Sequence, residues 1–179
     1  MLYVVLPAYN EEKALGVMLP ELRILAADLK LEVIVVNDGS QDGTAGMVRA
    51  AQTVPGLRVH LVEHAQNRGV GAAVRTGLLE AAKYAGPHDG VVTMDADGTH
   101  PIPLMREMAV RLAGDYDLVI ASRFVPGGQE VGLAPHRKFL SHGACRLMRT
   151  LFPLPGAKDY TCGYRAYRGD LLQRGIKAY

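Results

Sequence analysis

Length, composition and charge limit what this chain can be. Its 179 residues are 49% hydrophobic and include 20 glycines, which is typical of one compact α/β domain with many tight turns. No apolar run is long enough to cross a bilayer and no basic, apolar leader opens the chain, so a membrane-spanning protein or a secreted precursor is not expected. Cys145 and Cys162 stand apart without neighbouring metal-binding residues, which argues against a zinc site or a disulfide framework.

The first two-thirds of the chain alternate short apolar strands with amphipathic helices. This alternation predicts right-handed crossovers and a mostly parallel sheet with helices on both faces. Asn10 can cap the first helix, which Pro20 should kink or split, and the small residues of the third helix permit a close approach to the sheet or to a ligand. Strands are expected at 2–6, 32–36, 57–62, from 91 and at 118–122, and helices up to about 30 and at 42–52, 70–78 and 101–113.

Two carboxylates one residue apart, Asp95 and Asp97, end the strand that begins at residue 91. Ligands bind at the carboxyl ends of strands in open α/β sheets, and side chains at i and i+2 point the same way along a strand, so we expect both acids to face one point. Hard oxygen ligands of this kind favour Mg²⁺ or Mn²⁺ bridging to a substrate phosphate. The alternative is that the acids only cap the helix that starts near Pro101.

The last third of the chain is basic. Residues 124–168 hold seven Lys or Arg against two acids, which indicates that phosphate is also handled there. A Gly- and Pro-rich mobile loop is predicted over 125–135. The helix predicted over 137–152 either covers the sheet, which is the interpretation we favour, or rests on an anionic membrane surface. A strand or turn over 159–167 follows, and a further helix is expected to begin at Asp170.

Three motifs at successive strand ends resemble glycosyltransferase family 2, whose members have the GT-A fold. They are Pro7-Ala8-Tyr9-Asn10-Glu11, Asn37-Asp38-Gly39-Ser40 and Asp95-Ala96-Asp97. Within that family the dolichyl-phosphate mannose synthase branch and its polyprenyl-phosphate glucosyl relatives look similar at Ser122-Arg123-Phe124, Arg137-Lys138 and Asp159 to Arg165. The resemblance covers nearly the whole chain. It implies a Rossmann-like GT-A fold with a mostly parallel twisted sheet and helices on both faces.

The resemblance also implies which residues bind the donor and the metal ion. The nucleoside of a nucleotide-sugar would lie against Pro7, Tyr9, Glu11, Val36 and Asp38, and its diphosphate beside Asp95, Ala96 and Asp97. Asp97 and Thr99 would be ligands of Mg²⁺ or Mn²⁺, although Thr99 stands where that branch often has Gln or Ser. Because the catalytic domain of that branch usually continues through further strands, residues 1–179 are expected to be one catalytic domain that is truncated at its C-terminal end.

The chemistry of transfer predicts the remaining roles. Breaking the sugar–phosphate bond leaves negative charge on the diphosphate, which a divalent ion at Asp97, with Asp95 nearby, can neutralise and Arg123 can clamp. A polyprenyl phosphate is already ionised at neutral pH and can attack without a general base. It needs cations instead, and the candidates for this acceptor site are Arg137, Lys138 and Arg165.

The predicted protein is an inverting, metal-dependent hexosyltransferase. It would move mannose or glucose from a nucleotide-sugar, with GDP-mannose and UDP-glucose both possible, to a polyprenyl phosphate of the dolichyl type. It would be cytoplasmic and peripheral at the cytosolic face of a membrane, with no nucleic-acid partner.

Two alternatives use the same residues. The segment Asp95-Ala96-Asp97-Gly98-Thr99 also looks like the nucleophile motif of haloacid-dehalogenase-type phosphatases, in which the first Asp attacks phosphate and the second acts as an acid. That motif normally opens the chain, whereas here it lies past the midpoint, without a convincing later lysine and acidic pair. The other alternative is a module that binds a sugar nucleotide without turnover.

Overall fold

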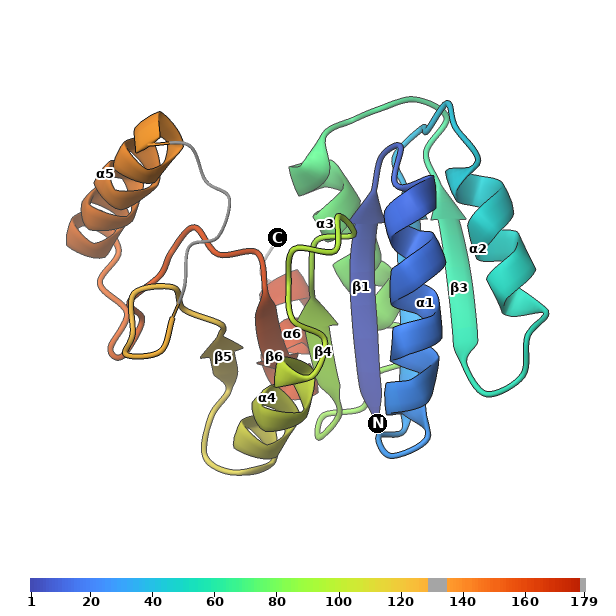
Figure 1. Cartoon of the computed structure of the whole chain (residues 1–179). Coiled ribbons are helices and arrows are strands. Elements are labelled where there is room, and N and C mark those ends of the chain that lie inside the picture. The colour runs from blue at the N-terminus through green and yellow to red at the C-terminus, as the bar shows by residue number, and fades with distance from the viewer. Residues whose placement is uncertain (129–134, 178–179) are drawn as a thin grey trace.

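Six strands of the described chain form one sheet with helices on both of its faces (Figure 1). The computed structural model describes residues 1–128 and 135–177, with all of their side chains except those of 135–140 and 177. The strands are β1 Leu2–Ala8, β2 Leu31–Asn37, β3 Arg58–Glu63, β4 Gly90–Thr93, β5 Leu118–Ile120 and β6 Arg165–Arg168. The helices are α1 Glu12–Ala26, α2 Thr44–Gln52, α3 Val70–Ala81, α4 Leu104–Ala113, α5 Pro135–Leu151 and α6 Gly169–Lys177.

The strand order in the sheet is β3-β2-β1-β4-β6-β5. The first four strands are parallel, since β1 pairs with both β2 and β4, and β2 pairs with β3. Strand β6 is inserted between β4 and β5 and runs antiparallel to both, although it follows both in the chain. The mostly parallel sheet is therefore confirmed, and the place and direction of β6 are additional findings.

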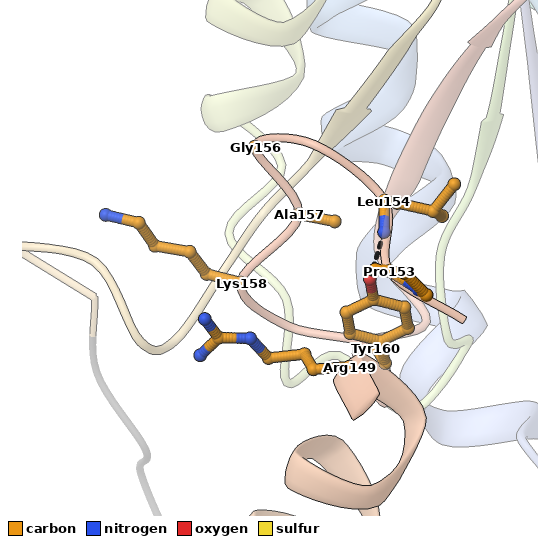
Figure 2. A pocket seen from close by; sticks show the side chains of 7 residues that line it. All are labelled: Arg149, Pro153, Leu154, Gly156, Ala157, Lys158 and Tyr160. Carbon is orange, nitrogen blue, oxygen red and sulfur yellow. Dashed lines mark hydrogen bonds between the residues drawn. The ribbon is translucent and has the colours of Figure 1, made fainter. Parts of the chain in front are cut away.

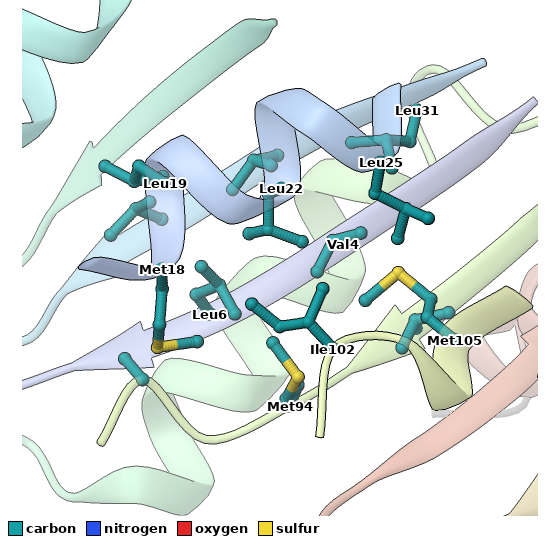
Figure 3. Packing of buried hydrophobic residues seen from close by; sticks show 14 of the residues in the cluster. Val4, Leu6, Met18, Leu19, Leu22, Leu25, Leu31, Met94, Ile102 and Met105 are labelled. Atoms are coloured by element: carbon teal, nitrogen blue, oxygen red, sulfur yellow. The ribbon is translucent and has the colours of Figure 1, made fainter. Parts of the chain in front are cut away.

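Alternate residues of the central strands face two separate hydrophobic cores. Val4 and Leu6 of β1 belong to the cluster packed beneath α1, α2 and α4, part of which Figure 3 shows. Tyr3 and Val5 belong to a second cluster, packed with α3 and α6. Because β1 is buried on both sides, it is apolar throughout rather than alternating. The predicted helices on both faces are confirmed.

Helix α1 runs without interruption through Pro20, so the predicted split is wrong. Its apolar face is buried as its helical spacing predicts, at Leu15, Met18, Leu19, Leu22 and Leu25. The helix ends at Ala26, before the predicted end near residue 30. Asn10 is not its cap, because the capping position is occupied by Glu11, which makes no capping hydrogen bond with its side chain.

Helix α3 approaches the sheet at a glycine. A Cβ added to Gly77 would lie 2.2 Å from Cγ1 of Val5 and 3.1 Å from Cγ2 of Val36, far inside van der Waals contact. Ala73 and Ala81, on the same face, are also buried. The small residues of this helix therefore let its backbone lie directly on β1 and β2.

Helix α5 stands apart from the sheet (Figure 1). From residue 142 to residue 151 its side chains are exposed apart from that of Cys145, and neither hydrophobic core includes a residue of this helix. The favoured interpretation, a helix that covers the sheet, is therefore wrong for the described part. Most of the loop predicted over 125–135 lies outside the described residues.

The described chain also bears on two expectations from composition. Cys145 and Cys162 are both buried free thiols, as expected. None of the helices described is long and apolar enough to cross a membrane.

Candidate functional site

A cavity of about 320 Å³ lies at the carboxyl ends of β1, β2 and β4. Seven of the eight residues predicted to bind a nucleotide-sugar line it: Pro7, Tyr9, Glu11, Asp38, Asp95, Ala96 and Asp97. The rest of the lining is Ala8 and four residues from the start of α3 and the loop before it, Asn67, Gly69, Val70 and Ala73. We call this space the donor cavity.

Val36 is the predicted donor residue that does not line the donor cavity. Its side chain is completely buried in the core beneath α3, where Gly77 packs closely against it. The predicted contact between this side chain and a nucleoside is therefore wrong. Its position in the middle of an apolar strand places it in the core instead.

The loops that follow β1 and β2 are tied to each other at the edge of the cavity. The backbone N–H of Gln41 donates to Oδ1 of Asn10 at 2.8 Å, and the N–H of Glu11 donates to Oγ1 of Thr44 at 2.9 Å. Asn10 has a φ of 58°, a left-handed conformation that Asn tolerates better than most residues. These bonds fix the backbone on which Tyr9 and Glu11 are carried.

Asp38 is buried at the cavity and is held by three groups. Its Oδ1 lies 2.6 Å from Nδ1 of His64, and its carboxylate accepts the backbone N–H groups of Arg68 and Gly69 at 3.0 and 2.8 Å. On the other side of the imidazole, Nε2 of His64 lies 2.9 Å from Oγ1 of Thr76. Burial alone would raise the pKa of Asp38, but the hydrogen bonds from His64 and the two N–H groups lower it below its ordinary value.

His64 is a site residue that the sequence analysis missed. Its side chain is buried, with 6% exposed, and connects Asp38 to helix α3. His64 directly follows β3, as Tyr9 follows β1 and Asp38 follows β2. That position is the signal that could have identified it, because the carboxyl ends of parallel strands meet at one edge of the sheet.

Asp95 and Asp97 lie in the turn after β4, since that strand ends at Thr93. Oδ2 of Asp95 is 3.1 Å from Nε2 of His100, and Oδ1 of Asp97 accepts the backbone N–H and the hydroxyl of Thr99 at 2.9 and 2.7 Å. Both acids line the donor cavity. We expected both acids to face one point because side chains two residues apart point the same way along a strand. That reason is wrong, because neither residue belongs to the strand.

The capping alternative for these acids is also wrong. Helix α4 begins at Leu104 with Pro103 at its capping position, and no side chain makes a capping hydrogen bond there. Asp95 and Asp97 instead remain at the cavity, several residues before the helix.

Negative charge accumulates at the donor cavity. Burial, and then the charges of Asp97, Asp42 and Asp95, raise the pKa of Glu11 above its ordinary value. The described residues that line the cavity include no Lys or Arg. A cation would relieve this repulsion, so the site has the electrostatic character of a cation-binding site.

The donor set fits a divalent ion that is completed by substrate phosphates. Among the residues that the structure describes, no three His, Cys, Asp or Glu side chains are grouped to hold a metal ion. Mg²⁺ is usually held by one or two carboxylates together with substrate phosphates and water, rather than by a cage of protein ligands. The carboxylates of Asp95 and Asp97 agree with that pattern.

Arg123 does not line the donor cavity, and it binds Asp159. Its Nε lies 2.8 Å from Oδ2 of Asp159 and its Nη2 lies 3.0 Å from Oδ1, a bidentate ion pair. Nη2 also lies 2.6 Å from Oγ1 of Thr161 and 3.3 Å from Oγ of Ser141. Burial would raise the pKa of Asp159, but the Arg123 guanidinium and backbone N–H groups lower it to about 2. The predicted contact of Arg123 with phosphate stays a prediction.

Of the three residues predicted for the acceptor, only Arg165 has a side chain within the described structure. Nε and Nη2 of Arg165 donate to the backbone carbonyls of Cys162 and Tyr160 at 2.7 and 2.6 Å, so this guanidinium braces the loop before β6. Arg137 and Lys138 belong to α5, but their side chains lie outside the described residues. The acceptor site therefore stays a prediction.

Comparisons with known proteins agree with the motifs. The model of the family Glycosyl transferase family 2 matches residues 3–175. A polyprenol monophosphomannose synthase of Mycolicibacterium smegmatis is 33% identical over 171 residues, which cover 96% of this chain and 63% of that protein. An undecaprenyl-phosphate mannosyltransferase of Micrococcus luteus is 37% identical over 174 residues, covering 94% of this chain and 67% of that protein. The chain thus spans about two-thirds of the length of these curated relatives.

A solved structure extends the likeness to the fold. It is a mannosyltransferase of Pyrobaculum calidifontis in complex with GDP-Man and Mn²⁺, 26% identical, with a TM-score of 0.56 over 97% of this chain and 46% of that chain. The predicted GT-A fold is confirmed. The family match favours the glycosyltransferase prediction over the phosphatase. Its motifs, its fold and the match over almost its full length show that the chain belongs to glycosyl transferase family 2.

Proposed function

We propose that the chain transfers a hexose from a nucleotide-sugar to a polyprenyl phosphate, with inversion at the anomeric carbon and with a divalent metal ion. The main support for this proposal is the donor cavity, in which residues from three separate motifs meet at the carboxyl ends of parallel strands. The names of the two mannosyl-transferring relatives support a polyprenyl-phosphate acceptor and mannose as the sugar.

The donor would lie across the cavity from the β1 loop to the β4 turn. Tyr9 has 42% of its surface exposed at this edge and offers an aromatic face to the nucleoside base. Asp38 already accepts two backbone N–H groups and contacts His64, so its contribution is to fix the Arg68–Gly69 backbone that forms one wall. The diphosphate would lie on the acidic side, beside Asp95 and Asp97.

Asp97 and Thr99 would hold the metal ion, with phosphate oxygens of the donor and water completing its shell. Oγ1 of Thr99 lies 2.7 Å from Oδ1 of Asp97, so the two oxygens can reach one ion. When bound, the ion supplies Lewis-acid stabilisation of the negative charge on the departing diphosphate. Asp95, which contacts His100, would add negative charge that favours the cation.

The acceptor side needs cations rather than a base. A phosphate monoester is ionised at neutral pH, so its oxygen can attack the anomeric carbon from the side opposite the leaving diphosphate, which inverts the configuration. Arg123, Arg137, Lys138 and Arg165 are the proposed positive groups on this side. The ionised carboxylate of Asp159 would hold the Arg123 guanidinium in one orientation.

A lipid acceptor requires contact with a membrane, and α5 supports a peripheral one. Large apolar side chains are exposed along and after this helix, at Leu147, Met148, Leu151, Phe152 and Leu154. They are interspersed with basic residues, a combination typical of helices that lie in the interface of an anionic membrane. We propose that this region brings the site to the cytosolic face of a membrane.

The test is a transfer assay with the purified chain, Mn²⁺, GDP-mannose or UDP-glucose, and a short-chain polyprenyl phosphate that dissolves in water. A lipid-linked hexose of inverted configuration, lost on chelation of the metal, would support the proposal. Calorimetry with GDP or UDP and Mn²⁺ distinguishes an enzyme from a binding module, because a binding module would bind the nucleotide but give no product in the transfer assay. Absence of both binding and product would refute the proposal.

A further inference from the structure

We propose that a second cavity, formed by the end of α5 and the segment after it, binds the phosphate of an anionic lipid head group. Its volume is about 250 Å³, and it is lined by Arg149, Pro153, Leu154, Gly156, Ala157, Lys158 and Tyr160 (Figure 2). It shares no lining residue with the donor cavity and none with the predicted acceptor site. The inference deepens the membrane contact in the proposed function and depends on it.

The wall of this lipid-phosphate cavity is held in place by Tyr160 and Cys145. The Tyr160 hydroxyl donates to the carbonyl of Phe152 at 2.9 Å and accepts the N–H of Leu154 at 2.8 Å, as Figure 2 shows for the second bond. The thiol of Cys145 donates to the carbonyl of Lys158 at 3.2 Å. The segment is therefore fastened at two points, to itself and to α5, which preforms the cavity for a ligand.

Two cations border the cavity, and none of the described residues that line it is acidic. Arg149 lies one helical turn after Cys145, and its guanidinium extends to the same side of the cavity as the ammonium group of Lys158 (Figure 2). Both side chains are exposed, and neither makes an ion pair with an acid within the described residues. A guanidinium and an ammonium group on the same side of one cavity match the oxygens of a phosphate.

Exposed apolar side chains lie in the same segment as these cations. Leu151, Phe152 and Leu154 have 58%, 59% and 55% of their surface exposed to water. A segment that combines large exposed apolar side chains with a pair of cations fits a ligand that carries a charged phosphate on an apolar body. A phospholipid in a bilayer presents both parts at once, whereas free phosphate would leave these apolar side chains in water.

The experiment measures binding of the full chain to vesicles by co-sedimentation. One set is pure phosphatidylcholine and the other is an equal mixture of phosphatidylcholine and phosphatidylglycerol. Binding should require phosphatidylglycerol, and Arg149→Gln and Lys158→Gln should each weaken it by about tenfold, the loss of roughly one charged hydrogen bond to a phosphate. Arg149→Lys keeps the charge and should retain most of the binding.

Arg146→Gln is the matched control. Arg146 is an exposed arginine on the same helix, outside the cavity lining, so this variant removes the same charge. It should lose less than half of the binding. Equal losses from Arg146→Gln and Arg149→Gln would show a general electrostatic attraction and would overturn the proposed site.

Two further measurements keep the outcome decisive. Circular dichroism of every variant tests whether a loss of vesicle binding is due to unfolding. If Arg149→Gln does not fold, Lys158→Gln and Arg149→Lys are compared with Arg146→Gln instead. Binding of inorganic phosphate to the chain in solution, together with vesicle binding that does not change in Arg149→Gln or Lys158→Gln, would make free phosphate the ligand and overturn the lipid assignment. Transfer by the unchanged chain to a water-soluble acceptor tests the proposed function separately, because it needs no vesicle.

Discussion

Arg123 and Asp159 are 36 positions apart in sequence and form a bidentate ion pair, with nitrogen–oxygen distances of 2.8 and 3.0 Å. The arginine follows β5 and the aspartate precedes β6, and these two strands are neighbours in the sheet. The ion pair therefore links the segment after β5 to the segment before β6. Asp159 is completely buried and also accepts the N–H groups of Thr161 and Cys162. One carboxylate therefore organises both the arginine and the turn.

Replacing Asp159 by Asn should destabilise the protein by about 2 kcal/mol, because the Arg123 guanidinium loses its anionic partner while a fifth of it still reaches water. Urea unfolding followed by circular dichroism measures the change in the free energy of unfolding. Asp115→Asn, at an exposed position, is the control and should change it by less than about 0.5 kcal/mol. Equal stability of the two variants would contradict the prediction.

The same pair predicts how stability depends on pH. Folding lowers the pKa of Asp159 from its ordinary value to about 2, so the unfolded chain takes up this proton more readily than the folded chain. The stabilisation from Asp159 is therefore complete above about pH 4 and is lost as the pH falls toward 2. The difference in unfolding free energy between the unchanged chain and Asp159→Asn should shrink over that interval. A difference that stays constant there would argue against the ion pair as its source.

His64 should act on donor binding through Asp38. In His64→Ala the carboxylate of Asp38 loses a 2.6 Å contact and is less able to hold the Arg68–Gly69 backbone at the cavity. We expect the dissociation constant for GDP or UDP with Mn²⁺ to rise by about tenfold, the loss of roughly one charged hydrogen bond. Calorimetry measures it.

Two variants separate this positioning role from a general loss of structure. Thr76→Val removes only the outer contact to Nε2 and should cause a smaller loss in the same direction. His88→Ala, at an exposed position outside the cavity, should leave nucleotide affinity unchanged. With saturating donor, His64→Ala should regain most of the turnover rate, and a turnover rate that stays low would contradict a role in donor binding.

Gly77 should tolerate no side chain. Alanine there would place a Cβ 2.2 Å from Val5, so we expect Gly77→Ala to cost about 3 kcal/mol or more through overpacking. Gly71 lies in the same helix with nothing within 4 Å of an added Cβ, and Gly71→Ala should stabilise the protein by about 0.5 kcal/mol through helix propensity. Thermal unfolding of the two variants compares the same substitution in one helix. Equal melting temperatures would show that α3 does not lie so close to the sheet.

Asp97 should be required for metal-dependent nucleotide binding. Asp97→Asn keeps the size of the side chain and removes its charge, so Mn²⁺ should no longer strengthen nucleotide binding, and transfer should fall by a hundredfold or more. Asp115→Asn again serves as the control for a surface aspartate. If Mn²⁺ still strengthened nucleotide binding to Asp97→Asn, the proposed ligand would be wrong.

Much of the nucleotide-binding half could be predicted because its signals are local. Each strand there is an apolar run followed by a motif, and parallel strands bring all their carboxyl ends to one edge, so the motifs meet without any knowledge of long-range pairing. Seven donor residues reach the cavity for this reason. Val36 does not line the cavity, because it lies before the end of its strand and its side chain faces the core. Which residues of a strand face the core depends on the register of the strand in the sheet.

The structure of the second half of the chain depends on contacts between residues far apart in sequence, which the spacing of apolar residues does not reveal. Strand β6 pairs with β4 across more than seventy residues, and Arg123 meets Asp159 across 36. Neither pairing leaves a local pattern. The exposed position of α5 was unpredictable for a related reason, since its apolar and basic residues fit either a sheet or a membrane.

The antiparallel insertion of β6 has a consequence for how the polypeptide acquires its shape. Strands β4 and β5 have emerged from a ribosome well before residues 165–168, yet the outer edge of β4 and the paired edge of β5 have no partner until those residues arrive. During synthesis the β4 edge would stay open, with backbone groups able to pair with another chain. Completion of this part of the sheet should therefore wait for residues 165–168, and chains released before residue 165 should aggregate.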